Sequence, residues 1–509
     1  MSIDRTKRSL INISVSIVSR ILVTLLPFAT RTIMIQTIGI EYLGVDSLFA
    51  SVLNMLSLSE LGFSSAVVYS MYKPVAVGDD ESVRGLLCFY KAVYRVIGFI
   101  ILGVGLILLP NLQWFIAEGT TYPSDINIYI VYLVLLVNAA SSYFLFSYKS
   151  AVLIATMRND IDSIIDTVRS IVSHGLQIVA LLLFREYYLY IFILPIVTIA
   201  NNIFRAILIN KKYPQYRGKG KLSKEDRYGI LTRVGALIGN KLGGVVFTSV
   251  DSIVISKYLG LIVLAKYTNY FTIFSAVFAI ETTVYSAIQS VIGNSLVSNS
   301  KENNFSLFKD LFNITIIISF VCVCCFTTLY QPFMAIWVGS DNLLSIEIPL
   351  LLALYYFIKS TRKPLFTFYE AAGLWRADFL KPYVSVIVNL VMNVVLVQII
   401  GLPGVIISSI IALAVVEMPW ESIVFFKHYF NVKVTEYVVL VLKSVIFCSI
   451  AFVITFFVGD FLPCGIWGIV LRLIVTLAIC AVVSLIMLRF THGGRQVWER
   501  LGFILKRKS

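Results

Sequence analysis

The stretch SELGFSSAVVYS, residues 59–70, lies inside a long apolar segment and returns in altered form as IETTVYSAIQSV, residues 280–291. An offset of 221 residues (281 minus 60) brings three identities together: Glu60 with Glu281, Ser65 with Ser286, and Ala66 with Ala287. The same offset matches two further pairs: Gly39 with Gly260, and Arg20 with Lys241. Several matches at one offset indicate that the chain contains an internal repeat.

The repeat extends beyond these two segments. ATMRNDIDSIIDTV (155–168) resembles AAGLWRADFLKPYV (371–384), with one residue inserted in the second copy. Because the matches fall in equivalent apolar segments, they predict a duplicated unit of six helices. An even number of helices leaves both copies the same way up in a membrane. We therefore expect an axis along the membrane normal to relate them, and a ligand site between the two lobes.

The composition is that of a membrane protein. Of the 509 residues, 58% are hydrophobic and 14% are charged, and the mean hydropathy is +0.88. A soluble domain is about 45–50% apolar and about 25% charged. Apolar runs of about twenty residues recur along the chain, which is the length that a helix needs to cross a bilayer. The alternating short segments of an outer-membrane barrel are absent from the sequence.

Fourteen apolar segments are long enough to span a bilayer, and the chain is predicted to be an all-α integral membrane protein. The predicted spans are 10–37, 43–72, 91–112, 126–148, 163–184, 187–210, 229–258, 262–297, 311–337, 346–370, 382–400, 402–427, 437–459 and 464–490. The first six form one repeat and the next six form the other. The last two spans have no counterpart.

Basic residues gather in the loops at alternate ends of these spans. They are Arg5, Lys7, Arg8, Lys73, Arg84, Lys91, Lys149, Arg158, Lys301, Lys309, Arg376, Lys381, Lys427, Lys433, the bases of 211–227, and those of the tail from Arg489 to Lys508. The opposite loops contain only Arg185. The positive-inside rule therefore predicts that both termini are cytoplasmic. This distribution explains the formal charge of +14 without nucleic-acid binding.

The predicted organisation follows from the spans and the repeat. An N-lobe of six spans occupies 1–210, and a basic cytoplasmic linker occupies 211–228. A C-lobe of six spans occupies 229–427, and two extra spans with a basic cytoplasmic tail occupy 428–509. The linker is interpreted as a solvated connection that enforces topology. The outer loops are short, which argues against an extracellular catalytic domain.

Eight charged residues fall inside spans, where each costs about 2.5–3.5 kcal/mol on insertion scales and therefore needs a partner or a function. The bases are Arg20, Arg31, Lys241 and Lys266, and the acids are Asp46, Glu60, Asp251 and Glu281. All eight lie on the first two helices of each repeat. This clustering is the feature of the sequence that says most about function.

Two interpretations of the eight charges remain open. They can be structural ion pairs, for which Arg31 and Asp46 are candidates because both lie near the outer ends of neighbouring spans. Alternatively, the bases line a water-filled cavity and bind an anionic headgroup, since the planar fork of arginine can donate twice to a phosphate. In that case Glu60 and Glu281 are repeat-related partners of the cavity bases.

Other polar residues within spans carry weaker signals. Lys359, Arg362 and Lys363 are expected to extend toward the cytoplasmic surface, because long basic side chains can do so from within a helix. His174 is expected to be a hydrogen-bonded packing residue. Glu417 and Glu421 are expected to be hydrated. No Cys or His spacing indicates a metal or cofactor site.

Two regions resemble a known family. TIGIEYLGVDSLFASVLNMLSLSELGFSSAVV (37–68) is similar to the first-to-second-helix signature of the polysaccharide-transport branch of the MOP flippase superfamily, which contains the Wzx-type O-antigen flippases. AAGLWRADFLKPYVSVIVNLVMNVVLVQIIGLPGVIISSIIA (371–412) is similar to its pattern in spans eleven and twelve. The resemblance implies two six-helix lobes that form a V and alternate between inward-open and outward-open states.

The resemblance also implies a substrate, a lipid-linked oligosaccharide that moves from the cytoplasmic to the outer leaflet on undecaprenyl diphosphate. Arg20, Arg31, Lys241 and Lys266 are the bases expected to bind the diphosphate and the first sugars. Related lipid II flippases carry an arginine and an aspartate fifteen residues apart, as Arg31 and Asp46 are here, and a Glu-x-Gly like that at 60–62. Span eight, however, offers Lys266 and no evident arginine, so lipid II is the weaker option.

The expectation is therefore a non-enzymatic flippase of the bacterial inner membrane. Its partners are the lipid-linked oligosaccharide and membrane lipids, with a polysaccharide polymerase and a chain-length regulator as candidates. The alternatives are a lipid II flippase, a MATE-type exporter, a membrane polysaccharide polymerase and a scaffold for polysaccharide assembly. The residues specify neither the sugar nor whether transport is coupled to a proton or sodium gradient.

Overall fold

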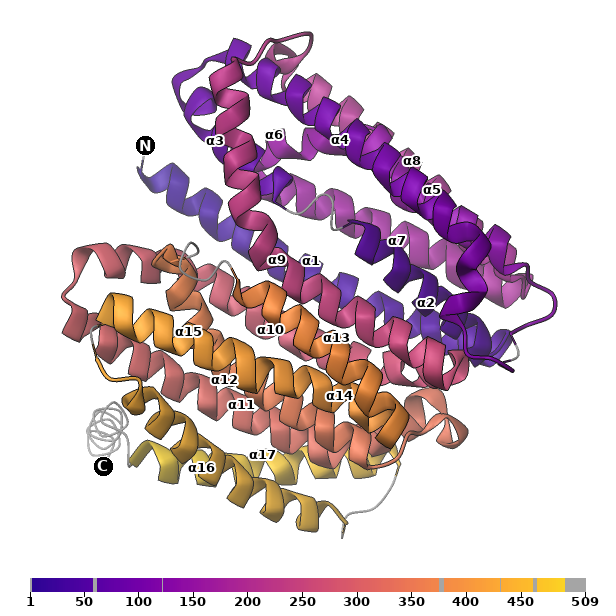
Figure 1. Cartoon of the computed structure of the whole chain (residues 1–509), viewed down its shortest axis with the longest axis vertical. Coiled ribbons are helices and arrows are strands. Elements are labelled where there is room, and N and C mark those ends of the chain that lie inside the picture. The colour runs from indigo at the N-terminus through magenta and orange to yellow at the C-terminus, as the bar shows by residue number, and fades with distance from the viewer. Residues whose placement is uncertain are drawn as a thin grey trace. The chain divides into compact units, whose positions relative to one another are not determined.

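The computed structural model describes residues 2–57, 62–120, 122–374, 380–430, 432–460 and 465–489, and these residues contain helices and no strand. The helices of the first half are α1 (Ser2–Thr37), α2 (Ile40–Leu56), α3 (Phe63–Val77), α4 (Asp80–Leu108), α5 (Ile128–Phe144), the short α6 (Ser150–Ala155), α7 (Asn159–Leu183) and α8 (Tyr187–Lys212). Figure 1 shows their arrangement.

The second half is helical in the same way. Its helices are α9 (Lys224–Leu259), α10 (Leu261–Ser298), α11 (Lys301–Val338), α12 (Glu347–Ala371), α13 (Lys381–Ile400), α14 (Leu402–Ile411), α15 (Met418–Phe425), α16 (Thr435–Asp460) and α17 (Ile466–Arg489). Each of the fourteen predicted spans coincides with one of these helices or with a pair of them. The all-α membrane fold predicted from the sequence is confirmed.

Eight of the described helices are long and apolar enough to cross a membrane, and a ninth span results if α5 and the bent segment Ser147–Ala155 are counted together. Other predicted spans fail that test for physical reasons. Every eighteen-residue window of α12 contains Lys359, Arg362 and Lys363. The second predicted span is divided into α2 and α3, each of which is shorter than eighteen residues.

The break in the second span is a departure from the continuous helix predicted at 43–72. Gly62 has a left-handed backbone with φ of 91°, and α3 begins at the next residue. At the equivalent position of the second repeat the chain has Thr283, and α10 passes through it as a continuous helix. A β-branched residue rarely adopts positive φ, whereas glycine does so at no steric cost.

Backbone features recur at offsets equal or close to that of the sequence repeat. Residues with positive φ form four pairs at offsets of 216 to 221: Gly39 with Gly260, Gly119 with Gly339, Met157 with Gly373, and Arg185 with Gly401. The helices α4 and α11 begin 221 residues apart, and each is capped by the residue before it. Asp79 accepts a hydrogen bond from the Ser82 amide, and Ser300 accepts one from the Asn303 amide. These matches support a duplicated helical unit.

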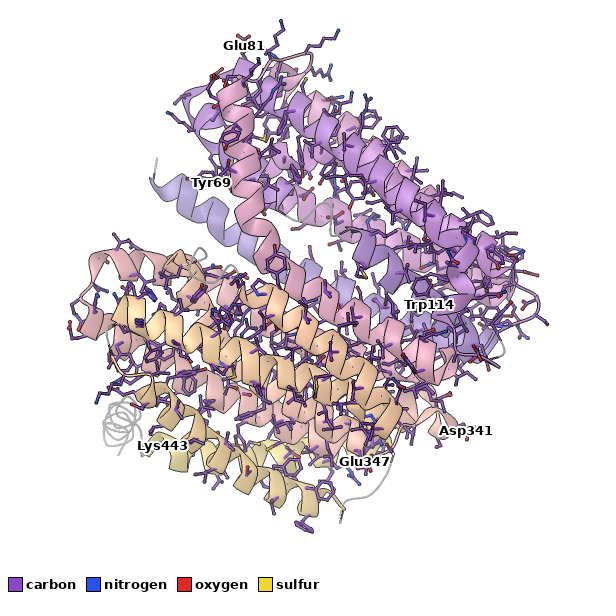
Figure 2. All side chains as sticks on the ribbon, in the orientation of Figure 1. Tyr69, Glu81, Trp114, Asp341, Glu347 and Lys443 are labelled. Atoms are coloured by element: carbon purple, nitrogen blue, oxygen red, sulfur yellow. The ribbon has the colours of Figure 1, made fainter. Side chains whose placement is uncertain are left out.

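The chain packs as two compact units, Met1–Thr268 and Asn269–Ser509. Within the first unit α1 packs along α7, α5 packs against α4 and α8, and α2 packs against α9. Figure 2 shows Glu81 and Trp114 at opposite ends of α4 and the 3-10 turn Leu109–Phe115 that follows it. Within the second unit α11 packs against α12, α16 and α17, and α13 packs against α14. The lobe boundaries predicted from the repeat, 1–210 and 229–427, remain a prediction.

The linker between α8 and α9 packs against the first turns of α4. The Arg84 guanidinium donates a hydrogen bond to the Gln215 carbonyl at 2.9 Å. Gly85 and Gly220 permit the contact, because a Cβ added at Gly85 would lie 2.6 Å from the Lys221 carbonyl oxygen. A Cβ added at Gly220 would lie 2.3 Å from the Gly85 nitrogen. The linker thus contacts α4, while most of its residues are exposed to solvent.

Gly220→Ala is expected to detach the linker from α4. The neighbouring atoms are backbone, so they cannot move aside as a flexible side chain would, and overpacking of this kind costs about 1–3 kcal/mol. Limited trypsin digestion should then cut faster after Lys219 and Lys221 than in the wild type. Gly229→Ala is the control, because nothing lies within 4 Å of a Cβ at that position. Equal digestion rates for Gly220→Ala and Gly229→Ala would contradict this account.

Candidate functional site

The first polar cluster inside the membrane-spanning part lies where α1, α2 and the start of α10 meet. Arg31 on α1 donates a hydrogen bond from Nη1 to Thr268 Oγ1 on α10 at 3.4 Å. Ser47 on α2 places its Oγ 3.2 Å from the same Thr268 oxygen. The guanidinium of the half-buried Arg31 therefore contacts the Thr268 hydroxyl, which in turn contacts that of Ser47. A cation held in this way can exchange its hydroxyl contact for an anionic ligand.

A glycine allows α2 to approach closely enough for this cluster to form. A Cβ added at Gly44 would lie 2.4 Å from the Leu261 carbonyl oxygen, at the first residue of α10. Gly44 is one helical turn before Ser47, so its contact with Leu261 sets the distance between Ser47 and Thr268. Gly260, with φ of 89°, forms the turn that brings the chain from α9 into α10.

Gly44→Ala is expected to push α2 away from the start of α10 and to separate Ser47 from Thr268. The new methyl group would clash with a backbone carbonyl, which costs about 1–3 kcal/mol in a packed interior. Cysteine crosslinking measures the separation: a pair introduced at Ser47 and Thr268 should crosslink more slowly when Gly44→Ala is also present. Gly103→Ala is the matched control, since a Cβ at Gly103 would meet no atom within 4 Å. Unchanged crosslinking would show that Gly44 does not set the spacing.

Asp46 belongs to the same cluster. It lies close enough to Arg31 for electrostatic attraction, and both side chains are half-buried. Tyr190 on α8 lies near both charges. Its ring stacks on Tyr187, whose ring lies 5.1 Å from that of Tyr42. The structure thus brings together Arg31 and Asp46, which the sequence suggested as neighbours. Tyrosine side chains lie beside them.

The remaining predicted residues of the first unit are placed as follows. Lys266 lies on α10, two residues before Thr268, and is half-buried. Asp251 lies on α9 and is 4% exposed. The backbones of Arg20 and Lys241 lie in α1 and α9, but their side chains are outside the described part of the structure. Glu60 lies outside the described residues altogether.

Glu281, the predicted acid of the second unit, is buried between α10 and α12. Its carboxylate accepts hydrogen bonds from the Tyr356 hydroxyl at 2.9 Å and from Ser360 Oγ at 2.7 Å. Lys359 and Lys363 lie close enough to attract it. The bases that Glu281 faces are therefore on α12. The sequence interpretation had made Glu281 a partner of the cavity bases Arg20, Arg31, Lys241 and Lys266.

The lysines of α12 were expected to extend toward the cytoplasmic surface, and in the structure both contact aromatic rings. The Lys359 ammonium lies over three aromatic rings, at 4.6 Å from Phe278, 5.2 Å from Tyr355 and 5.6 Å from Phe274. Lys363 lies 5.8 Å from the Phe278 ring. Such cation–π contacts stabilise a charge within an apolar setting. The spacing of Lys359 and Lys363, four residues on one helix face, was the signal in the sequence.

A buried ion cluster joins α12, α13 and α15 in the second unit. Arg362 contacts Glu417 at 2.7 Å, and its Nε donates to Glu421 at 2.7 Å. Lys381 contacts Glu421 at 2.5 Å. The Glu421 side chain is fully buried and that of Glu417 is 7% exposed. The expectation that both glutamates are hydrated is wrong, because each is neutralised by a basic side chain from a neighbouring helix.

The helix that carries these glutamates is irregular. A π-helical segment, Ala412–Glu417, precedes α15, and a second one, Phe426–Phe430, follows it. Insertions of this kind are frequent at functional sites. A polar line continues from the ion cluster along α13, where Ser385 Oγ donates to Glu417 at 2.9 Å. These contacts had no clear signal in the sequence, because the partners lie on three different helices.

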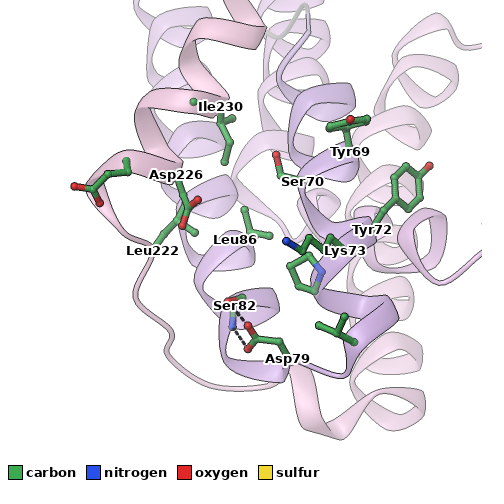
Figure 3. A pocket seen from close by; sticks show the side chains of 14 residues that line it. Tyr69, Ser70, Tyr72, Lys73, Asp79, Ser82, Leu86, Leu222, Asp226 and Ile230 are labelled. Carbon is green, nitrogen blue, oxygen red and sulfur yellow. Dashed lines mark hydrogen bonds between the residues drawn. The ribbon is translucent and has the colours of Figure 1, made fainter.

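A cavity of about 780 Å³ opens in the first unit between the end of α3, the start of α4 and the start of α9 (Figure 3). Tyr69 and Tyr72 lie on one side of it, and Asp226 lies on the other. Lys73 and Leu86 also line it. Within the described residues, no group of three or more His, Cys, Asp or Glu side chains could hold a metal ion. His174 packs against α1, where its Nδ1 lies 2.8 Å from Thr30 Oγ1.

No family model matches the chain, and no curated protein matches it. Solved structures do. The lipid II flippase MurJ, in an inward-closed conformation, is 16% identical with a TM-score of 0.64, and the match covers 94% of this chain and 98% of MurJ. The chain shares the fold of that structure. An inward-facing multidrug-resistance MATE transporter of the MOP superfamily is 14% identical with a TM-score of 0.61, covering 83% of this chain and 98% of its own.

A MATE transporter of Vibrio cholerae, VcmN, is also similar, at 12% identity and a TM-score of 0.58, over 84% of this chain and 99% of VcmN. At such identities the likeness establishes the fold alone. The apolar helices and the fold shared with these membrane proteins indicate a multi-pass membrane protein. The proteins that share this fold are transporters and flippases by name.

Proposed function

We propose that the protein is a flippase that moves an oligosaccharide linked to undecaprenyl diphosphate from the cytoplasmic to the outer leaflet. The observation that carries the proposal is Arg31, a base inside a membrane span, whose guanidinium donates to the Thr268 hydroxyl, which also contacts the Ser47 hydroxyl. Intramembrane charges of this kind mark substrate pathways. A diphosphate is the anionic group that a lipid-linked sugar presents at that depth.

The proposed site is built from bases of both repeats. Arg31 and Lys266 lie on α1 and α10, and we assign Arg20 and Lys241 to the same site from their equivalent sequence positions. Ser47 and Thr268 are equivalent in the two repeats (268 minus 47 is 221), and their hydroxyl groups are in contact. Equivalent residues of two repeats contact each other where they lie next to the two-fold axis that relates the repeats. Transporters built from repeats bind substrate at such an interface.

Each group has a role in the proposed cycle. Arg31 donates two hydrogen bonds to phosphate oxygens, which its planar fork favours. Asp46 attracts Arg31 and keeps it oriented while the site is empty. The isoprenoid tail stays in the bilayer, and rocking of the two repeats about the bound diphosphate exposes the sugar to the other side. No covalent bond of the substrate is broken.

The alternatives differ in the ligand they require. A MATE-type exporter of cationic drugs favours an acidic cavity, whereas Arg31 and Lys266 accompany the acids here. The MATE structures also cover less of this chain than the lipid II flippase does. A lipid II flippase is the second candidate, because the lipid II flippase structure covers 94% of the chain and lipid II also carries a diphosphate. A polymerase would need acid and base groups around a sugar.

The proposal includes a place in the cell. The distribution of Lys and Arg puts both termini and the 211–228 linker in the cytoplasm of a bacterium, with the spans in its inner membrane. A polysaccharide polymerase and a chain-length regulator are proposed partners on the outer face, since they consume what the flippase delivers. The proposal includes coupling of the transport cycle to a proton or sodium gradient and does not specify which ion.

Leaflet-resolved accumulation of lipid-linked oligosaccharide tests the proposed function. In cells that lack this protein, complete repeat units should accumulate facing the cytoplasm, and the wild-type chain should restore their appearance on the outer face. Accumulation of lipid II in place of oligosaccharide would move the assignment to the second candidate. If repeat units still reach the outer face but stay unpolymerised, the proposal fails and the polymerase alternative gains.

A further inference from the structure

The cavity between α3, α4 and α9 combines opposite charges with aromatic and apolar walls (Figure 3). Its volume of about 780 Å³ is within the range of small-molecule sites, which is about 300–1,000 Å³. Lys73 from the end of α3 supplies a base. Glu225 and Asp226 from the first turn of α9 supply acids.

Two of these charges are unused by the protein itself. Within the described residues, Lys73 and Glu225 make no hydrogen bond and no ion pair. Asp226 accepts a hydrogen bond at Oδ2 from Ser223 Oγ, at 2.7 Å. Its other carboxylate oxygen, Oδ1, stays available to a ligand. Asp79 differs, because its two oxygens accept from the Ser82 amide and hydroxyl. The cavity thus presents an uncommitted base and uncommitted acids.

We propose that this cavity binds the headgroup of a zwitterionic lipid that carries a phosphate and a primary amine, such as phosphatidylethanolamine. Lys73 and the hydroxyl of Tyr72 contact the phosphate. Glu225 and Asp226 accept hydrogen bonds from the ammonium. Charge-assisted hydrogen bonds of both kinds are stronger than those between neutral groups. Leu86 and Ile230 give the glycerol and the first methylene groups an apolar wall.

The balance of charge selects among lipids. The lining contains three acids, Asp79, Glu225 and Asp226, and one base, Lys73. An anionic headgroup or a diphosphate would be repelled by that excess of negative charge, whereas a zwitterion has a partner for each of its charges. This site is therefore separate in chemistry from the base cluster around Arg31, and it does not depend on the proposed transport function.

The rim of the cavity places it at the depth of lipid headgroups. Tyr69 is 64% exposed and Tyr72 is 43% exposed. Tyrosines of this kind gather at the membrane–water interface, where the ring lies among lipid and the hydroxyl meets headgroups. The sequence places the neighbouring bases Lys73 and Arg84 on the cytoplasmic side. The inner leaflet is accordingly the source of the lipid.

Lipid titration of the purified full chain in detergent, followed by native mass spectrometry, tests the proposal. Phosphatidylethanolamine should bind more tightly than phosphatidylcholine, whose quaternary amine has no N–H to donate, and phosphatidylglycerol should bind least. Glu225→Gln with Asp226→Asn should remove the preference for phosphatidylethanolamine over phosphatidylcholine, a change of about tenfold. Lys73→Ala should weaken both zwitterionic lipids together.

The controls keep the test specific to the cavity. Glu302→Gln removes an acid from the first turn of α11, as Glu225→Gln does from α9, but it does not line the cavity. Lys219→Ala removes a linker lysine outside the cavity lining. Both controls should bind lipids as the wild type does. The proposal is overturned if the cavity variants keep the wild-type preference, if phosphatidylglycerol binds as tightly, or if glycerophosphoethanolamine without acyl chains binds equally well.

Discussion

Arg31→Ala is expected to abolish the appearance of lipid-linked oligosaccharide on the outer face while leaving the protein in the membrane. Loss of one partner from a desolvated charge contact costs about 2–5 kcal/mol, which corresponds to a transport rate at least thirtyfold lower by rough arithmetic. Arg31 is half-buried and contacts Thr268 from the other repeat, so its loss removes a base from inside the span. Complete repeat units should accumulate facing the cytoplasm.

Three further variants separate ligand binding from structure. Arg31→Lys keeps the charge but loses the planar fork, so partial activity is expected. Thr268→Val removes the hydroxyl that Arg31 contacts and leaves the base in place, so it should reduce transport less than Arg31→Ala does. Arg185→Ala, at the turn after α7, is the control and should transport normally. Normal flipping by Arg31→Ala would rule out the diphosphate role, and equal loss from all four variants would indicate a folding defect.

The positions of the spans could be predicted from the sequence, because hydropathy and helix length are local properties. The predicted span 187–210 corresponds to α8, Tyr187–Lys212, and 382–400 corresponds to α13, Lys381–Ile400. The break at Gly62 could not be predicted in the same way. A single glycine is compatible both with a continuous membrane helix and with a break between two helices. Only its backbone φ angle distinguishes a continuous helix from a broken one.

Contacts in the candidate site could be predicted where both residues lie on two consecutive helices. They could not be predicted where residues from several helices meet. Arg31 and Asp46 lie on consecutive spans, so their proximity follows from topology. The hydroxyls of Ser47 and Thr268 were missed, because serine and threonine are common in spans and their contact joins positions 221 residues apart. Glu421 was misjudged for a related reason: its partners Arg362 and Lys381 come from two other helices.

Glu421→Ala is expected to be the most destabilising substitution in the second unit. Glu421 is fully buried and accepts hydrogen bonds from both Arg362 and Lys381, so its removal leaves two buried cations with Glu417 as the remaining acid of the cluster. Breaking a buried ion pair by removing one partner costs about 3–5 kcal/mol. Thermal unfolding of the purified protein in detergent should show a clearly lower midpoint, with the helices α12, α13 and α15 losing protection from hydrogen exchange first.

Replacing both members of a buried ion pair is expected to cost much less stability than removing one of them. Replacing Arg362 and Glu421 together by methionine and leucine removes one base and one acid, so Lys381 and Glu417 keep the cluster neutral. An apolar pair of similar volume is often as stable as the buried ions it replaces. We expect Arg362→Met with Glu421→Leu to recover most of the stability that Glu421→Ala loses. Glu347→Ala, an exposed acid in the first turn of α12, should have no effect. A double variant no more stable than Glu421→Ala would mean that the geometry of the ion cluster, and not its charge balance, holds these three helices together.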